Sequence, residues 1–203
     1  MSAASNELLE FGGEFPLPWL MNIGERFALA GLLQWLKPRL SLEIGTHQGG
    51  SLQALSKFSE HVISIDRNPE VSRELEARFP NVFFRCGDSA KLLPVIVDET
   101  NRSDAVLDFV LIDGDHTTAG VRRDIEALLK LVPRARCVIL MHDSGNPDCR
   151  AGIKSAPWSA CPYVHDMQLD FVPGPGFNQW GQWGGFACAL LRPEKRTLPL
   201  FVL

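Results

Sequence analysis

The stretch that decides the fold runs Leu40-Ser-Leu-Glu43-Ile-Gly45-Thr-His-Gln-Gly49-Gly50-Ser51. Its first half has the alternating apolar pattern of a buried strand, and the residues from 51 to 58 place leucine and phenylalanine on one face of a helix. The glycines between them allow positive φ angles and close approach of a ligand to the helix N-terminus. We expect a strand, a turn and a helix, with a turn that either holds a nucleotide-like ligand or only makes a tight connection.

The glycine spacing departs from the dinucleotide-binding pattern G-x-G-x-x-G, because His47 occupies the position of the second glycine. The chain has E-x-G-x-x-x-G-G instead, with Glu43 two residues before the first glycine. An acid at this position can accept hydrogen bonds from a cationic or hydroxylated ligand. The pattern therefore argues against a dinucleotide as the ligand.

Composition restricts the class of partner. A chain of 203 residues has the length of one domain, which we place at 24–203, after an N-terminal arm and surface segment over 1–23. The net charge of −4, with acidic and basic residues interspersed, argues against a nucleic-acid or membrane partner and favours a small molecule. Five scattered cysteines without C-x-x-C spacing indicate free thiols in a reducing compartment.

The N-terminal residues carry no targeting signal. Residues 1–10 lack the basic and apolar regions of a secretory signal, and no apolar segment is long enough to cross a bilayer, so we expect a cytoplasmic protein. Residues 11–20 are rich in glycine and proline, which predicts an irregular segment across the surface or over a site. Phe15 and Trp19 either cap a pocket there or pin the segment down.

The rest of the chain alternates between helices and strands. This order predicts an α/β fold with an open, mostly parallel seven-stranded sheet, helices on both faces, and a ligand site beyond the carboxyl ends of the strands. We expect helices over 24–35, 51–58, 69–79, 90–98 and 117–131, a lid or short helix within 149–162, and strands over 41–44, 61–65, 82–86, 107–112, 137–141, 168–172 and 185–191.

Polar residues follow the second and third strands. Asp66 lies 21 residues after Gly45, close to the spacing of roughly 20 at which an acid reaches ribose hydroxyls in dinucleotide folds, although it also suits a turn or helix cap. Asp88 and Ser89 either bond the edge of a base or only cap the following helix.

Together these motifs resemble S-adenosylmethionine-dependent methyltransferases with a Rossmann-like sheet, over about residues 24–143. The resemblance rests on the motifs Glu43-x-Gly45-x-x-x-Gly49, Asp66, Gly87-Asp88-Ser89 and Ile112-Asp113-Gly-Asp-His116. The longer stretch from Phe109 to Asp124, with Met141-His-Asp143, resembles the branch of cephalosporin hydroxylase-like and macrolide-sugar O-methyltransferases. The resemblance implies that Glu43, Gly45, Thr46, Gly49 and Ser51 surround the methionyl part, Asp66 the ribose, and Asp88 with Ser89 the adenine, with Asp113 also in the cofactor set.

The same branch suggests a divalent metal. Asp113 ends the fourth strand and His142-Asp143 ends the fifth, and neighbouring strands about 4.8 Å apart would bring these side chains to one cation. We predict Asp113, His142 and Asp143 as ligands of magnesium or manganese. The resembling enzymes carry a Glu-Asp pair where this chain has His-Asp, and histidine favours softer ions, so the sequence leaves the metal open.

His116 is the predicted catalytic residue. It lies three residues after Asp113, and an imidazole that titrates near neutral pH can take the proton from a hydroxyl as the methyl group is transferred. The alternative is a histidine that caps the next helix or bonds a backbone carbonyl.

The segment from 173 to 185 is too glycine-rich for a helix and places Phe177, Trp180 and Trp183 on a loop. These aromatic residues either form a substrate wall or cover the core or a dimer contact. Together with the N-terminal segment, they are candidate interface pieces of a homodimer.

The predicted function is methyl transfer from S-adenosylmethionine to a hydroxyl of a small metabolite, with divalent-metal assistance. The alternatives are a metal-dependent hydrolase or hydroxylase-like oxygenase, and a non-catalytic nucleotide-binding subunit. No residue pattern identifies the acceptor.

Overall fold

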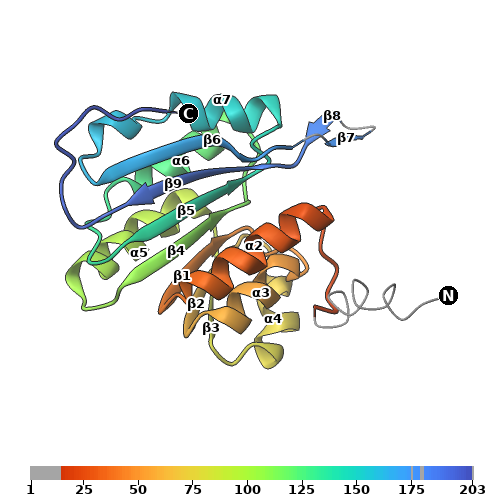
Figure 1. The fold of residues 1–203 in the computed structure, drawn as a ribbon. Helices are drawn as coiled ribbons and strands as arrows, with labels where there is room; N and C mark the ends of the chain where they lie inside the picture. Colours follow the sequence, from red (N-terminus) through yellow and green to blue (C-terminus); the bar gives the residue numbers. More distant parts are fainter. Residues whose placement is uncertain (1–14, 175, 179–180, 203) are drawn as a thin grey trace.

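The computed structural model describes residues 15–174, 176–178 and 181–202. The predicted arm over 1–10, the first residues of the predicted surface segment and Trp180 lie outside them. Figure 1 shows one sheet with helices packed on both faces. The helices are α2 (Ile23–Leu36), α3 (Gly50–Phe58), α4 (Pro69–Leu75), α5 (Ser89–Arg102), α6 (Thr118–Leu128) and α7 (Pro147–Ser155), with short 3₁₀ turns η1 (Glu76–Arg78) and η2 (Trp158–Ala160).

The main sheet has seven strands in the order β3-β2-β1-β4-β5-β9-β6. Neighbouring strands from β3 to β5 pair in parallel, and β9 is antiparallel to both of its neighbours, so the predicted mostly parallel sheet is confirmed. The strands are β1 (Leu40–Ile44), β2 (His61–Asp66), β3 (Val82–Cys86), β4 (Leu107–Ile112), β5 (Cys137–His142), β6 (Val164–Val172) and β9 (Phe186–Leu191), and β7 (Gly176–Asn178) pairs with β8 (Gly181–Trp183) in a separate hairpin.

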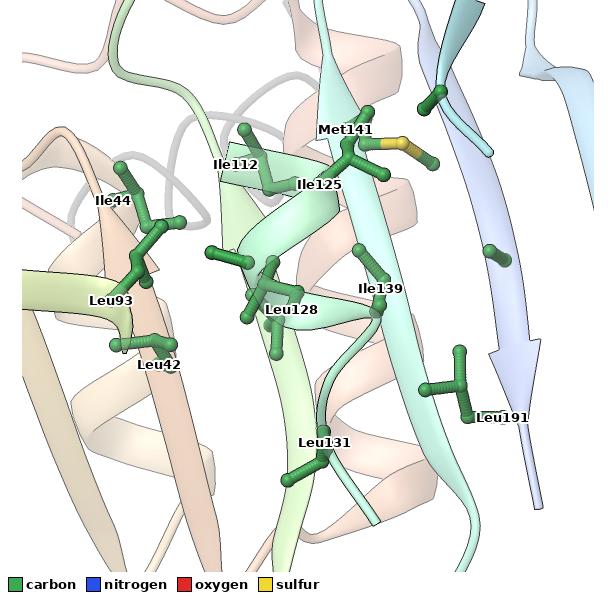
Figure 2. Close-up of a cluster of buried hydrophobic side chains, with 14 of the residues drawn as sticks. Leu42, Ile44, Leu93, Ile112, Ile125, Leu128, Leu131, Ile139, Met141 and Leu191 are labelled. Atoms are coloured by element: carbon green, nitrogen blue, oxygen red, sulfur yellow. The ribbon is translucent and has the colours of Figure 1, made fainter. Parts of the chain in front are cut away.

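Strand β4 shows why both faces are covered. Because successive side chains of a strand point to opposite faces, Val110 and Ile112 join one apolar cluster, whereas Phe109 and Leu111 join the other. The first cluster holds the inner faces of α5, α6 and α7, and Figure 2 shows part of it around β1, β4 and β5. The second holds those of α2, α3 and α4.

Several element boundaries differ from the predicted ones. Helix α5 continues four residues past the predicted end at Asp98, because Thr100 is buried and its hydroxyl bonds the Ile96 carbonyl. Helix α4 ends at Leu75, where a 3₁₀ turn replaces the rest of the predicted helix. The expected short helix in 149–162 is α7, which begins earlier because Asn146 accepts hydrogen bonds from its first turn.

The segment from Phe15 to Met21 crosses the start of α3. Gln53 bonds both the amide and the carbonyl of Leu17, at 3.0 and 3.2 Å, and Phe15 and Trp19 are buried in the apolar cluster below. These two aromatics therefore pin the segment to the domain. Across the described ranges, no helix is long and apolar enough to span a membrane.

Candidate functional site

The candidate site lies at the carboxyl ends of β1, β2, β4 and β5. The strand order reverses between β1 and β4, so the loops after these two strands face each other. Gly45 makes their contact feasible: its φ is +90°, and a Cβ there would lie 2.1 Å from the backbone oxygen of Asp113. A larger residue at position 45 would force the two loops apart.

Glu43 is fully buried in β1 next to this turn. Its carboxylate accepts hydrogen bonds from Ser51 Oγ at 2.6 Å and from Ser64 Oγ at 3.0 Å. Burial raises the pKa of Glu43 to about 7, against the opposing effect of the two hydroxyls. Two of the predicted cofactor residues, Glu43 and Ser51, are therefore joined directly.

Asp66 organises the glycine-rich turn. Its Oδ2 accepts from the amides of Thr46 and His47, at 3.0 and 2.8 Å, while its Oδ1 accepts from the amide of Asn68 at 2.8 Å. The side-chain cap of α4 is Asn68, whose Oδ1 accepts from Glu70. Asp66 thus makes the turn contacts that were its alternative role in the sequence analysis. It also lies beside the glycine-rich turn, where a ribose is expected.

Helix α3 begins at the other end of this turn. Its N-cap is Gly49, with a φ of +82° and no side-chain cap. The Phe15–Met21 segment lies against this helix start, since a Cβ at Gly50 would lie 2.5 Å from the Pro18 carbonyl oxygen.

The residues after β3 make local contacts. Asp88 caps α5 by accepting from the amide of Ala90 at 3.0 Å, which is the capping role foreseen as its alternative. Ser89 Oγ donates to Asp124 Oδ1 at 2.8 Å. Asp124 is buried, and desolvation raises its pKa to about 6.

Two acids and a histidine converge after β4 and β5. One ligand atom each from Asp113, His116 and Asp143 lies within 4.8 Å of the other two. His116 Nε2 is 3.3 Å from Asp113 Oδ1 and 3.2 Å from Asp143 Oδ2. Asp143 takes a φ of +55°, and its Oδ1 accepts from the amide of Gly184 at 2.6 Å, which leaves Oδ2 facing the cluster.

His142 lies behind this cluster. Its Nδ1 is 2.9 Å from Asp113 Oδ1 and 3.5 Å from Asp143 Oδ2, and its Nε2 is 3.4 Å from Glu25 Oε2. The structure thus brings together the predicted ligands Asp113, His142 and Asp143, and it adds His116 to them.

The charges of the cluster depend on one another. Burial lowers the pKa of His142, but the carboxylates of Asp113, Glu25 and Asp143 raise it well above the ordinary value. The hydrogen bond to Asp113 raises the pKa of His116 against the effect of burial. Burial raises the pKa of Asp113, yet the two histidines outweigh it and lower that pKa overall, whereas burial keeps the pKa of Asp143 raised.

Glu25 is the site residue that the sequence analysis missed. It lies on α2, is 1% exposed, and its carboxylate accepts from the amides of Asn22 at 2.7 Å and Gly185 at 2.5 Å. The available signal was the spacing Asn22-x-x-Glu25, which forms a capping box. That signal explains the helix start, but it does not reveal that the acid faces His142.

The predicted aromatic loop is in part a hairpin, because β7 pairs with β8, and Trp183 at the end of β8 reaches the site. Its ring meets the His116 ring edge to face, with centroids 5.5 Å apart. The Trp183 Nε1 atom is buried without a hydrogen-bond partner among the residues that the structure describes. The side chain of Phe177 lies outside those residues.

The side chains present fit a divalent cation. The carboxylates of Asp113 and Asp143 and the imidazole of His116 offer ligand atoms within 4.8 Å of one another, with His142 beside them, and these are common ligands of first-row metals. The turn over 45–51 lies at the same edge of the sheet, between the buried Glu43 and the partly exposed Asp66.

One comparison with known proteins identifies a family. A family model described as a methyltransferase domain matches residues 42–144. No curated protein matches the chain.

Solved structures match over nearly the whole chain. An O-methyltransferase from Bacillus cereus, described in complex with SAH, is 21% identical with a TM-score of 0.66, covering 95% of this chain and 92% of that one. A putative O-methyltransferase from Klebsiella pneumoniae is 19% identical with a TM-score of 0.63, covering 95% and 91%. The O-methyltransferase TomG from Streptomyces achromogenes, described as involved in tomaymycin synthesis and in complex with SAM, is 19% identical with a TM-score of 0.64, covering 95% and 91%.

Proposed function

The chain belongs to the methyltransferase domain family, and we propose that it transfers a methyl group from S-adenosylmethionine to a hydroxyl of a small molecule, assisted by a divalent cation. Family membership establishes a methyltransferase that uses S-adenosylmethionine. The acceptor atom, the cation and the residue roles are the proposal. Membership also favours methyl transfer over the hydrolase, oxygenase and non-catalytic alternatives.

One observation carries the proposal: the ligand atoms of Asp113, His116 and Asp143 lie within 4.8 Å of one another, next to the turn over 45–51. A methyl donor held at that turn and a hydroxyl held at the cluster would meet at the same edge of the sheet. The similarity to structures described as O-methyltransferases supports the choice of oxygen as acceptor atom.

The cofactor residues have separate tasks in this proposal. Asp66 lies where an acid would bond the ribose hydroxyls, and it also holds the turn through the amides of Thr46 and His47. Glu43 and Ser51 support the methionyl end, because the buried Glu43 fixes the start of α3 through Ser51. Asp88 and Ser89 are assigned to the adenine side.

The acid cluster would serve the acceptor. A divalent cation bound there would be held by the carboxylates of Asp113 and Asp143 and would supply Lewis-acid polarisation of the acceptor hydroxyl. His116 takes the hydroxyl proton, and the carboxylates of Asp113 and Asp143, 3.3 and 3.2 Å from its Nε2, stabilise the imidazolium that forms. Trp183 limits how far the His116 ring can turn. Because methyl transfer depends mainly on alignment, loss of the base would slow the reaction without abolishing it.

The direct test is calorimetric titration with S-adenosylmethionine and, separately, NAD, each with and without magnesium or manganese. We expect binding of S-adenosylmethionine only. A screen of hydroxyl compounds, each paired with the analogue that carries an amine in place of the hydroxyl, should then release S-adenosylhomocysteine only with the hydroxyl member. Turnover of the amine members alone would contradict the assignment of oxygen as acceptor.

A further inference from the structure

Glu25 is a buried carboxylate that has no role in the proposed reaction. It enters the site from α2, on the helical layer opposite α6 and α7, and it is 1% exposed. A buried carboxylate is costly unless charged or polar partners surround it. The partners of Glu25 therefore indicate its role in the site.

Both carboxylate oxygens of Glu25 are fixed. Oε1 accepts from the amide of Gly185 at 2.5 Å, and Oε2 accepts from the amide of Asn22 at 2.7 Å. A Cβ at Gly184 would lie only 2.6 Å from Oε1, so the chain before β9 closes on the carboxylate. With Oε1 occupied in this way, Oε2 lies 3.4 Å from His142 Nε2, a buried nitrogen that has no hydrogen-bond partner among the residues that the structure describes.

The His142 ring is held between two acidic sides. Nε2 faces Glu25, and Nδ1 faces Asp113 Oδ1 at 2.9 Å and Asp143 Oδ2 at 3.5 Å. The ring also packs against Phe186, with centroids 5.2 Å apart, and the side chain is 10% exposed. The imidazole therefore has little freedom to turn its Nδ1 away from the acids.

Distance alone does not choose between the two histidines as a metal ligand. His116 Nε2 lies 3.2 and 3.3 Å from the same two carboxylates, comparable with the distances of His142 Nδ1. Burial and support differ: the His116 side chain is 38% exposed, whereas His142 has a buried carboxylate behind its second nitrogen. A histidine that binds a metal almost always donates its other N–H to such a group, which fixes the tautomer and the ring orientation.

We propose that Glu25 is a positioning residue that holds His142 with Nδ1 directed at the cation, so that the site prefers a softer first-row ion, such as iron, cobalt or zinc, to magnesium. Two carboxylates and a nitrogen form a mixed donor set, and imidazole nitrogen favours such ions over the oxygen-seeking magnesium. His116 is then left to act as the base. The inference rests on the cation assistance in the proposed function.

The test measures the affinity of the 203-residue chain, with S-adenosylmethionine present, for Co²⁺ alone and for Mg²⁺ alone. The visible absorption of Co²⁺ reports the kind and number of its ligands. Two variants probe the proposal, Glu25→Gln and His142→Gln. His116→Gln is a third variant, which tests the other imidazole of the cluster. The matched control is Asn22→Ala, which breaks the same capping box but keeps the carboxylate of Glu25.

We expect Glu25→Gln and His142→Gln each to weaken Co²⁺ binding about 10-fold or more and to change the Co²⁺ spectrum, in line with the cost of removing an outer partner of a metal ligand. Magnesium affinity should change much less. His116→Gln should weaken Co²⁺ binding less than His142→Gln does, and the Asn22→Ala control should keep the wild-type Co²⁺ affinity. His142→Gln also serves if Glu25→Gln does not fold, because it removes the proposed nitrogen ligand itself.

Three outcomes would overturn the proposal: unchanged Co²⁺ affinity in folded Glu25→Gln and His142→Gln, loss of that affinity in His116→Gln alone, or equal weakening of Co²⁺ and Mg²⁺. Absence of any metal binding by the wild type would also overturn it. Binding of S-adenosylmethionine is measured in the same samples, so failure of the cation inference remains distinct from failure of the methyl-donor assignment.

Discussion

Glu43 and Asp66 belong to neighbouring strands and both face the glycine-rich turn, yet their surroundings differ. Glu43 is enclosed, and burial raises its pKa to about 7. Asp66 is partly exposed and uses both oxygens to hold backbone amides. At the scale of single residues, the same functional group is thus a buried acceptor of two hydroxyls in one strand and a partly exposed acceptor of backbone amides in the next.

Replacement of Asp66 by alanine should weaken S-adenosylmethionine binding by about 10-fold or more, because hydrogen bonds to a charged group contribute roughly 1.5–3 kcal/mol each. Titration calorimetry measures the dissociation constant. Glu70→Ala, an exposed acid paired with Arg73, is the control and should bind normally. An unchanged dissociation constant in Asp66→Ala would remove Asp66 from the cofactor site.

Asp143→Asn should lower divalent-metal affinity about 10-fold or more while leaving S-adenosylmethionine affinity within about twofold, since the change removes one ligand charge but keeps the acceptor for Gly184. Metal titration of the two proteins checks this. Asp148→Asn, an exposed acid at the start of α7, serves as control. Wild-type metal affinity in Asp143→Asn would show that the ligand set is different.

The raised pKa of Glu43 has a consequence for stability. Its pKa is 4.5 ordinarily and about 7 in the folded protein, so between these values the folded state holds more protons than the unfolded one. The free energy of unfolding therefore falls as pH rises from 4.5 to 7, by roughly 3 kcal/mol from this group.

Glu43→Gln should abolish that component, because glutamine does not titrate. Chemical unfolding of both proteins across this pH range should show the variant gaining stability relative to the wild type as pH rises. A difference that stays constant with pH would mean that Glu43 titrates near its ordinary value.

At the scale of elements, the start of α3 is covered by the Phe15–Met21 segment. A Cβ at Gly50 would lie 2.5 Å from the Pro18 carbonyl oxygen and 2.7 Å from Trp19 Cα. The absence of a side chain at this one position therefore lets the segment cross the helix start next to the site.

Gly50→Ala should destabilise the protein by about 1–3 kcal/mol, because the added methyl group meets backbone atoms. Gly31→Ala on α2 is a matched control, since a Cβ there meets nothing within 4 Å. That control should raise stability by up to about 1 kcal/mol through helix propensity. Urea unfolding measures the free energy of unfolding of both variants. Equal changes would mean that the Phe15–Met21 segment moves aside without an energetic cost.

At the scale of the whole molecule, the site unites loops from both halves of the sheet. Residues from α2, β1, β2, β4, β5 and the chain before β9 contribute to it. A ligand held there connects these parts and should stabilise the folded state as a unit.

Addition of S-adenosylmethionine at about 100 times its dissociation constant should contribute about 2.7 kcal/mol of stability. For a chain of this size that corresponds to a rise in melting temperature of roughly 5–10 °C. Thermal unfolding with NAD at equal concentration is the control and should show no rise. A rise with NAD alone would contradict the methyl-donor assignment.

Local patterns were sufficient for most of the architecture. Apolar periodicity acts within a few residues, so the sequence predicted the strand and helix order and the seven-stranded sheet. The extension of α5 to Arg102 was not predicted, because part of what holds this last turn is distant in sequence: Asn101 bonds the Lys130 carbonyl and the Val132 amide.

The sequence by itself determined the parallel sheet and the acids at the strand ends, since these follow from spacing along the chain, and its motifs carried the resemblance to methyltransferases. Only the tertiary structure brought Glu25 to His142 and Trp183 to His116. Those pairs are 117 and 67 residues apart in the sequence, and no local pattern encodes which of many buried or aromatic side chains will meet. Their meeting depends on the packing of α2 and of the β7–β8 hairpin against the carboxyl end of β5.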